Sequence, residues 1–153
     1  MTRKETAGIT PANSGFEGIV WNILGQTYVP KSLTEDSFSW HATFPDGTFV
    51  PPHIHPTQDE YLYILEGKLE FWLNGQEMSA TPGDLVRLPR GEPHGIFNRS
   101  GATAKSLFWV SPTGKLFDLF WGIHNLPKQE PEAVVALSAR HDVNFLPPPP
   151  GAA

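Results

Sequence analysis

Two histidines and a glutamate stand close together in a stretch that otherwise has the apolar character of a β-strand. Residues 51–67 read PPHIHPTQDEYLYILEG, with His53 and His55 two residues apart and Glu60 five residues later. Side chains alternate along a strand, so both imidazoles should project to one side and Ile54 to the other. An unpaired buried charge is very costly, and a divalent ion bound by imidazole and carboxylate is the simplest reason to bury these groups.

A third histidine, His94, is a candidate fourth ligand. It follows the turn-forming segment PRGEP and opens the strand-like stretch HGIFN. Glu60 comes just after the polar segment PTQD, and we expect a hairpin there that returns Glu60 to the side of His53 and His55. Iron, manganese, nickel, cobalt, zinc and copper all accept three histidines and one glutamate. The sequence therefore predicts one divalent transition-metal ion without naming the element.

The elements that must position these residues are short strands. Residues 38–44 alternate between apolar and polar side chains, as a half-buried strand does. From residue 59 to residue 111 the chain is divided into short runs that end at Gly, Pro or Asn-Gly, and Asn74-Gly75 is a strong signal for a two-residue hairpin. Many short strands at regular spacing predict an all-β sandwich or barrel.

The pattern changes near residue 114. Leu116, Leu119, Phe120 and Ile123 recur at helical spacing, and the segment that opens with Pro131 is rich in helix formers. We expect these helices to pack on the β domain and to act partly as a lid over its mouth. The expected parts are a flexible N-terminal arm (1–15), a β-barrel (16–112), a helical segment that packs on it (113–145) and a proline-rich tail (146–153).

Composition and charge narrow the class of protein and its partners. The 153 residues carry a formal net charge of −5, which argues against nucleic acid or an anionic membrane as the main partner. There is no cysteine, so disulfides, thiolate metal sites and cysteine nucleophiles are excluded. The first residues, MTRKETAGITPANSG, lack the apolar run of a signal peptide, and no stretch of about 20 apolar residues occurs. We expect a cytoplasmic protein whose partner is a small-molecule substrate.

Two motifs in tandem resemble those of the cupins, small β-barrels of the jelly-roll type. The first motif is filled at every fixed position, by Gly47, His53, His55, Glu60 and Gly67. The second is filled by Gly83, Pro89, Gly91, His94 and Asn98. The resemblance is close over residues 47–98 and looser over about 35–112. It implies an all-β jelly-roll barrel or sandwich, to which the sequence adds one or two C-terminal helices.

Within the cupins, the first motif and the segment GKLFDLFW are most similar to the quercetin-dioxygenase-like group. This resemblance implies that His53, His55 and His94 are metal ligands and that Glu60 is both a ligand and a general base. The substrate would be a small hydrophobic or aromatic enol or phenol, which loses a proton to Glu60 and is then attacked by dioxygen. Two alternatives stay open: a non-oxidative metal-dependent isomerase, cyclase, lyase or decarboxylase, and a non-catalytic small-molecule-binding cupin.

Other polar residues near the motifs are not expected to bind the metal. Asp59 should point to the face opposite Glu60, as a surface charge or a group behind the ligands. His41 shares a face with the polar residues of its strand and is expected at a surface or interface. Asn98 is expected to anchor a turn or to form a hydrogen bond near His94.

Several apolar residues are expected to line a pocket inside the barrel. Phe49 shares the strand phase of His53 and could line the pocket. Further side chains that could line the barrel interior are Leu62, Ile64, Phe71, Leu73, Ile96 and Phe108.

Edge strands of a small open barrel need cover, and the apolar segment GIVWNILG, residues 18–25, could supply it. We therefore expect a homodimer with its N-terminal strands at the contact.

Overall fold

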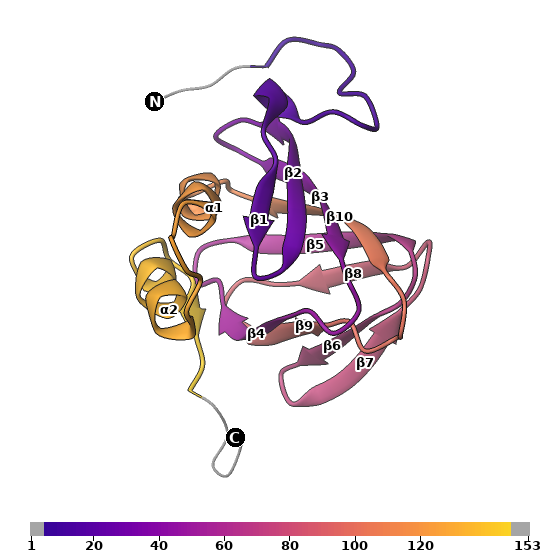
Figure 1. Ribbon diagram of the computed structural model, residues 1–153, viewed down its shortest axis with the longest axis vertical. Coiled ribbons are helices and arrows are strands. Elements are labelled where there is room, and N and C mark those ends of the chain that lie inside the picture. Colours follow the sequence, from indigo (N-terminus) through magenta and orange to yellow (C-terminus); the bar gives the residue numbers. More distant parts are fainter. Residues whose placement is uncertain (1–4, 148–153) are drawn as a thin grey trace.

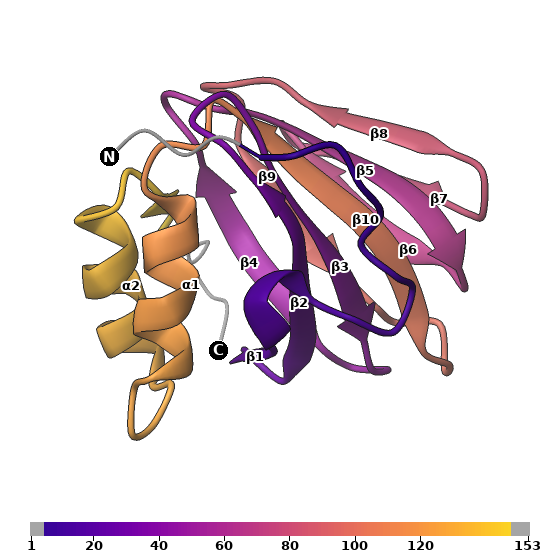
Figure 2. The ribbon, with the colours of Figure 1, turned by 90° about the horizontal axis from the view of Figure 1, so that it is seen from above.

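The structure, a computed structural model, describes residues 5–147 as two antiparallel sheets with two helices over one end (Figures 1 and 2). The order of the six-stranded sheet is β1 (Trp21–Ile23), β2 (Gln26–Leu33), β3 (Phe38–Phe44), β10 (Ala104–Ser111), β5 (Asp59–Glu66), β8 (Leu85–Leu88). The order of the five-stranded sheet is β11 (Asn144–Phe145), β4 (Phe49–Ile54), β9 (His94–Phe97), β6 (Leu69–Leu73), β7 (Gln76–Ala80). A short 3-10 turn, η1 (Phe16–Gly18), precedes β1. The predicted jelly-roll architecture is confirmed.

The inner face of the six-stranded sheet carries an aromatic core. The alternation predicted for β3 is confirmed, since Phe38, Trp40 and Phe44 are all buried. β10 pairs with β3 and adds Phe108, whose ring stacks on that of Trp40 with the centroids 5.2 Å apart. Burial of such rings stabilises the fold by about 25 cal/mol for each Å² of apolar surface removed from water. This packing fixes β10 and therefore its other neighbour, β5.

The turn between β6 and β7 has the predicted form. Asn74 and Gly75 both have positive φ angles, 47° and 90°, and join Leu73 to its partner Gln76. Two successive residues in the left-handed region make a type I′ turn, whose twist matches that of the flanking strands. Asn and Gly are the residues that adopt this conformation most readily, so the short sequence signal was sufficient here.

Both predicted helices form, as α1 (Leu116–His124) and α2 (Pro131–Ala139). α1 turns its apolar face toward the sheets, and its buried residues are those predicted from helical spacing: Leu116, Leu119, Phe120 and Ile123. The two helices lie side by side at one end of the sandwich (Figure 2). Gly122 permits their close approach, because a Cβ atom there would lie 3.0 Å from Cδ2 of Leu137.

After α2 the chain returns to the five-stranded sheet. β11 pairs with β4 and places Phe145 opposite His53. The sequence did not predict this strand, because two residues are too few to show a period. Its consequence is that the C-terminal segment is tied to the strand that carries two of the predicted metal ligands.

The described part of the N-terminal arm lies against β2. The ammonium group of Lys31 donates hydrogen bonds to the carbonyl oxygens of Pro11, Ala12 and Ser14. The flexibility expected of residues 1–15 stays a prediction, and residues 1–4 lie outside the described part of the chain, as do residues 148–153 of the expected proline-rich tail. Between residues 5 and 147, neither helix has the length and apolar character needed to cross a membrane.

The apolar N-terminal segment is used mostly within its own chain. Trp21 and Ile23 of β1 are buried, and the ring of Trp21 lies 5.6 Å from that of Phe120 on α1. Val20 is the large apolar residue of this segment that stays exposed. The N-terminal strand therefore offers little apolar surface to a second chain, and the expected homodimer stays a prediction.

Candidate metal centre

The two sheets together assemble the four predicted ligands. His53 on β4 lies opposite His94 on β9, and His55 follows the end of β4. Glu60 comes from β5 in the other sheet. The predicted hairpin between the histidines and Glu60 is wrong, because β4 pairs with β9 and β11 whereas β5 pairs with β10 and β8. The segment PTQD instead carries the chain from one sheet to the other.

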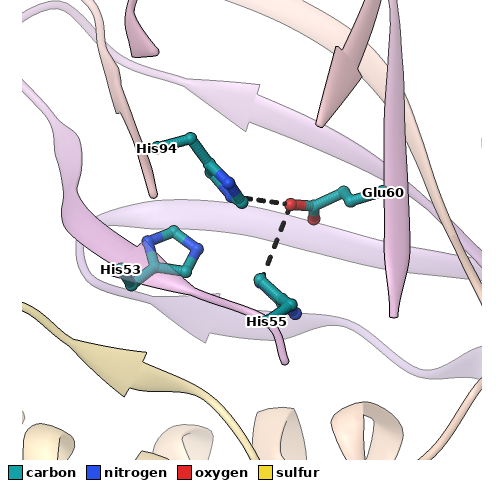
Figure 3. Close-up of side chains that lie close together, drawn as sticks. All are labelled: His53, His55, Glu60 and His94. Carbon is teal, nitrogen blue, oxygen red and sulfur yellow. Dashed lines mark ion pairs between the residues drawn. The ribbon is translucent and has the colours of Figure 1, made fainter. Parts of the chain in front are cut away.

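The four side chains converge on one buried point, as Figure 3 shows. Their ligand atoms all lie within 4.8 Å of one another, and none of the four residues is more than 4% exposed. Oε1 of Glu60 lies 3.1 Å from Nε2 of His94 and 3.7 Å from Nε2 of His55. This spacing allows a single ion to contact all four residues.

The histidine rings are oriented by hydrogen bonds on the side away from this point. Nδ1 of His53 donates to the carbonyl oxygen of Pro51 at 2.8 Å, and Nδ1 of His94 faces the carbonyl oxygen of Glu92 at 3.4 Å. An imidazole that carries its proton on Nδ1 keeps a lone pair on Nε2. The carbonyl groups thus select the tautomer that can bind a metal.

Two of the converging atoms have no hydrogen-bond partner within residues 5–147. These atoms are Oε1 of Glu60 and Nε2 of His94, and they face each other. A buried acceptor without a donor is unfavourable, and two facing lone pairs repel. A cation between them removes both problems, so the donor set fits a divalent metal ion.

The pKa shifts of these side chains also favour a metal site. Burial lowers the pKa of His53 well below its ordinary value, and burial is also the main reason that the pKa of His55 is lowered. Burial alone would raise the pKa of Glu60, but the adjacent imidazoles of His55 and His94 outweigh it and leave that pKa lowered. These directions favour neutral imidazole at His53 and His55 and an ionised carboxylate at Glu60, the forms that bind metal.

Comparison with known proteins agrees with this geometry. The cupin domain family matches residues 40–111, which hold both motifs and all four candidate ligands. This segment is a cupin domain. The chain is 36% identical over 84 residues to the tetracenomycin polyketide synthase protein TcmJ of Streptomyces glaucescens, a match that covers 54% of this chain. It is also 36% identical over 50 residues, or 33% of this chain, to quercetin 2,3-dioxygenase of Bacillus subtilis.

These similarities cover parts of the relatives only. The matched segments span 56% of TcmJ and 15% of the dioxygenase. Among solved structures, an RmlC-like cupin from Shewanella frigidimarina superposes with a TM-score of 0.60 over 70% of this chain and 96% of its own. At 18% identity this likeness shows the fold alone.

A residue that the sequence analysis missed, Gln58, holds His55 in place. Its Nε2 donates to the carbonyl oxygens of Pro112 and Thr113, at 3.1 and 2.6 Å, which leaves Oε1 to accept from Nδ1 of His55 at 2.9 Å. Gln58 is 2% exposed. A polar residue three positions after His55 was visible in PTQD, but only the tertiary structure shows that it is buried.

We expect Gln58→Leu to weaken metal binding by about 10- to 100-fold while leaving all four ligands present. The reason is that leucine fills similar space but cannot accept the Nδ1 proton of His55, so the tautomer and ring orientation are no longer fixed. Competition with a metallochromic chelator would measure the change. Gln76→Leu, at an exposed position on β7, is the matched control and should bind metal as the unaltered cupin does.

Stability without metal should fall on acidification. The unfolded chain protonates histidine near pH 6.5, whereas burial lowers the folded-state pKa of His53 and His55. Between these values the unfolded state binds more protons, so its free energy drops relative to the native state by up to about 1.4 kcal/mol per pH unit for each proton. Urea unfolding of chelator-treated protein at pH 7, 6 and 5 should show this loss. A His53→Ala/His55→Ala protein should show a shallower dependence, and an equal slope would contradict the assignment.

Three of the four candidate ligands, His53, His55 and Glu60, line a largely apolar cavity. Ile96 and Phe108 line it as predicted, whereas Leu62, Ile64 and Phe71 are buried in the sandwich away from it and Leu73 is partly buried. The expected role of Phe49 is wrong, since it is 48% exposed and stacks on Phe97. A register shift in β4 between Val50 and His53 reverses the strand phase, so Val50 lines the cavity instead.

The remaining motif residues hold the loops around the site. Asn98 donates to the carbonyl oxygens of Phe44 and Ala102, both at 2.8 Å, so it anchors a turn as predicted. Asp59 points outward and pairs with Arg90 at 3.0 Å, which confirms its predicted separation from the ligands. The amide of Gly91, whose φ of +80° favours glycine, donates to the carbonyl oxygen of His55 at 2.9 Å and ties the two motifs together.

The helices close the cavity. Leu119, Phe120 and Ile123 of α1 line it together with Val143 and Phe145 near the C-terminus. Its volume is about 50 Å³, whereas an engineered apolar cavity that holds one benzene molecule measures about 150 Å³. An aromatic ring therefore cannot enter unless the helices or their flanking segments move. The lid role expected from the sequence corresponds to this movement of the helices, and it stays a prediction.

Proposed function

We propose that this cupin is a metal-dependent enzyme that converts a small hydrophobic enol or phenol, and that the reaction is a quercetinase-like dioxygenation. The observation that carries the proposal is Glu60, an ionised carboxylate buried among three histidines in the wall of a largely apolar cavity. The similarity to quercetin 2,3-dioxygenase supports it. Such a cavity suits an apolar ring with a few oxygen substituents.

The chain would contribute positioning and proton transfer. Val50, Ile96 and Phe108 hold the ring and exclude water. The substrate oxygen then lies near Glu60, which accepts its proton and becomes a neutral carboxylic acid while the substrate becomes an enolate or phenolate. A divalent metal held by His53, His55, His94 and Glu60 would supply Lewis acidity that makes this proton easier to remove. Dioxygen then reacts with the activated substrate.

A second candidate is a non-oxidative isomerase, cyclase, lyase or decarboxylase. The longer match to TcmJ, a polyketide synthase protein, favours it, because a polyketide is an oxygen-rich chain whose reactions begin with the same loss of a proton. Glu60 would move that proton without the participation of dioxygen. A non-catalytic binding module would use the same cavity without turnover.

Two measurements on metal-loaded protein separate these functions. An oxygen electrode tests for dioxygen uptake with flavonols and with other enolic and phenolic compounds, and uptake matched to substrate loss supports the dioxygenase. Turnover that continues under nitrogen would contradict it and support the non-oxidative enzyme. Saturable binding without turnover in either condition would leave the binding module.

We also propose a homodimer, now through the outer face of the six-stranded sheet. Leu107, Tyr63 and Leu85 are register partners across β10, β5 and β8, and the last two are 42% and 48% exposed. Such a row of apolar side chains favours burial against a second copy. Light scattering at micromolar concentration should give twice the mass of one chain, and Leu85→Asp should shift it toward the single-chain mass. A monomeric mass for the unaltered protein would refute the proposal.

A further inference from the structure

The packing of α2 does not explain why the helix carries a serine at one of its buried positions. Ser138 is 1% exposed and lines the same cavity as His53, His55 and Glu60. Its Oγ has no hydrogen-bond partner in the part of the chain that the structure describes. Its own carbonyl oxygen accepts from the amides of His141 and Val143. The hydroxyl is therefore a free polar group inside an otherwise apolar wall.

A helical serine normally satisfies its hydroxyl in one of two ways. It points into solvent, or it donates to the carbonyl oxygen one turn earlier in the helix. Ser138 does neither, although alanine at this place would avoid the unfavourable burial of a hydroxyl without a partner. A partner that arrives with a ligand removes this penalty.

A second buried polar group without a hydrogen-bond partner belongs to a residue that lines the same cavity. Trp40 on β3 lines it, and Nε1 of Trp40 has no partner within residues 5–147 either. The indole N–H can only donate, whereas the Ser138 hydroxyl can donate or accept. Both groups can donate, so a hydrogen-bond acceptor on a ligand could pair with either of them. The other residues that line the cavity are mainly apolar.

We infer that Ser138 is a substrate-binding residue that donates a hydrogen bond to a second oxygen of the ring substrate. This oxygen is distinct from the one that loses its proton to Glu60. The inference rests on the proposed function only for the class of substrate, an oxygen-substituted ring. Since Ser138 lies on α2, a ligand with this second oxygen contacts both the metal-ligand cluster and a helix that closes the cavity.

The test measures binding and leaves turnover out. The full chain is loaded with Zn²⁺ and titrated under nitrogen with 2-naphthol and with the 2,6- and 2,7-dihydroxynaphthalenes, which add one oxygen to the same ring system. The unaltered protein should bind at least one dihydroxy compound about fivefold or more tightly than 2-naphthol, the usual scale of one net hydrogen bond. In Ser138→Ala this ratio should fall to about one, while the affinity for 2-naphthol and the zinc content stay unchanged.

A second buried serine provides the matched control. Ser106 is fully buried, but its hydroxyl donates to the carbonyl oxygen of Tyr63 at 3.0 Å and it does not line the cavity. Ser106→Ala should therefore lower the melting temperature and keep the ligand preference. Ser138→Ala should melt at or above the temperature of the unaltered protein, because it removes an unsatisfied group.

Two results would overturn the inference. One is a ligand preference that survives Ser138→Ala, above all with a loss of melting temperature, which would make the hydroxyl structural. The other is no preference in the unaltered protein, including no binding of either compound class. If Ser138→Ala does not fold, the comparison is made with Ser138→Cys, whose thiol is a weak donor and should reduce the ratio in the same direction. Absence of enzymatic turnover, by contrast, bears on the proposed function and leaves this binding test intact.

Discussion

Replacement of His53 by alanine should reduce the bound metal of the purified protein from about one ion per chain to almost none. The mutation removes one of four converging donors and leaves a gap in a site that is only 4% exposed at this residue. Three remaining ligands bind more weakly, and the empty space admits water without restoring a charge-matched donor. Elemental analysis after dialysis, with affinity for added Mn²⁺ or Zn²⁺ measured in parallel, gives the result.

His41→Ala is the control for this experiment. His41 is also a histidine on a central strand, but it lies on the opposite face of β3 from the buried Trp40 and is not among the converging residues. Its replacement should leave the metal content unchanged. Equal metal in the His53 and His41 variants, or an unaltered protein that takes up no metal after reconstitution, would contradict the assignment of the site.

Under the proposed function, replacement of Glu60 by glutamine should lower activity by about 10²-fold or more while a large share of the metal is retained. Glutamine keeps the shape of the side chain and one oxygen for coordination, but it has no carboxylate to accept the substrate proton. The lowered pKa of Glu60 means that the base is already ionised near neutral pH, so its loss should be felt across that range. Rate and metal content are measured on the same preparation.

Asp59→Asn separates a general effect of charge from the specific role of Glu60. Asp59 is the neighbouring acid on β5, but it pairs with Arg90 at the surface and faces away from the cavity. Its variant should keep nearly full activity. A metal-replete Glu60→Gln protein that is as active as Asp59→Asn would eliminate Glu60 as the base.

The site also links metal binding to folding. His53 and His94 come from one sheet and Glu60 from the other, so the complete ligand set exists only when the two sheets are packed. A ligand that binds only the native state raises the free energy of unfolding by about 2.7 kcal/mol at 100 times its dissociation constant. Added metal should therefore raise the melting temperature of the unaltered protein.

The sequence by itself determined those features that depend on near neighbours along the chain. The spacing of His53 and His55 placed both imidazoles on one side of a strand, and Asn74-Gly75 specified a tight turn through residues that accept positive φ. The apolar face of α1 followed from a 3.6-residue period. The two motifs were sufficient to identify the domain and the four side chains that converge in it.

Only the tertiary structure decided what depends on contacts between distant segments. It placed Glu60 in a different sheet from the histidines, turned Phe49 outward through the register shift in β4, and buried Gln58 behind His55. It also brought Ser138 from the C-terminal helix to the cavity. Strand partners, bulges and helix docking are selected by the packing of the whole chain, and a local pattern carries no information about a partner that lies far away in the sequence.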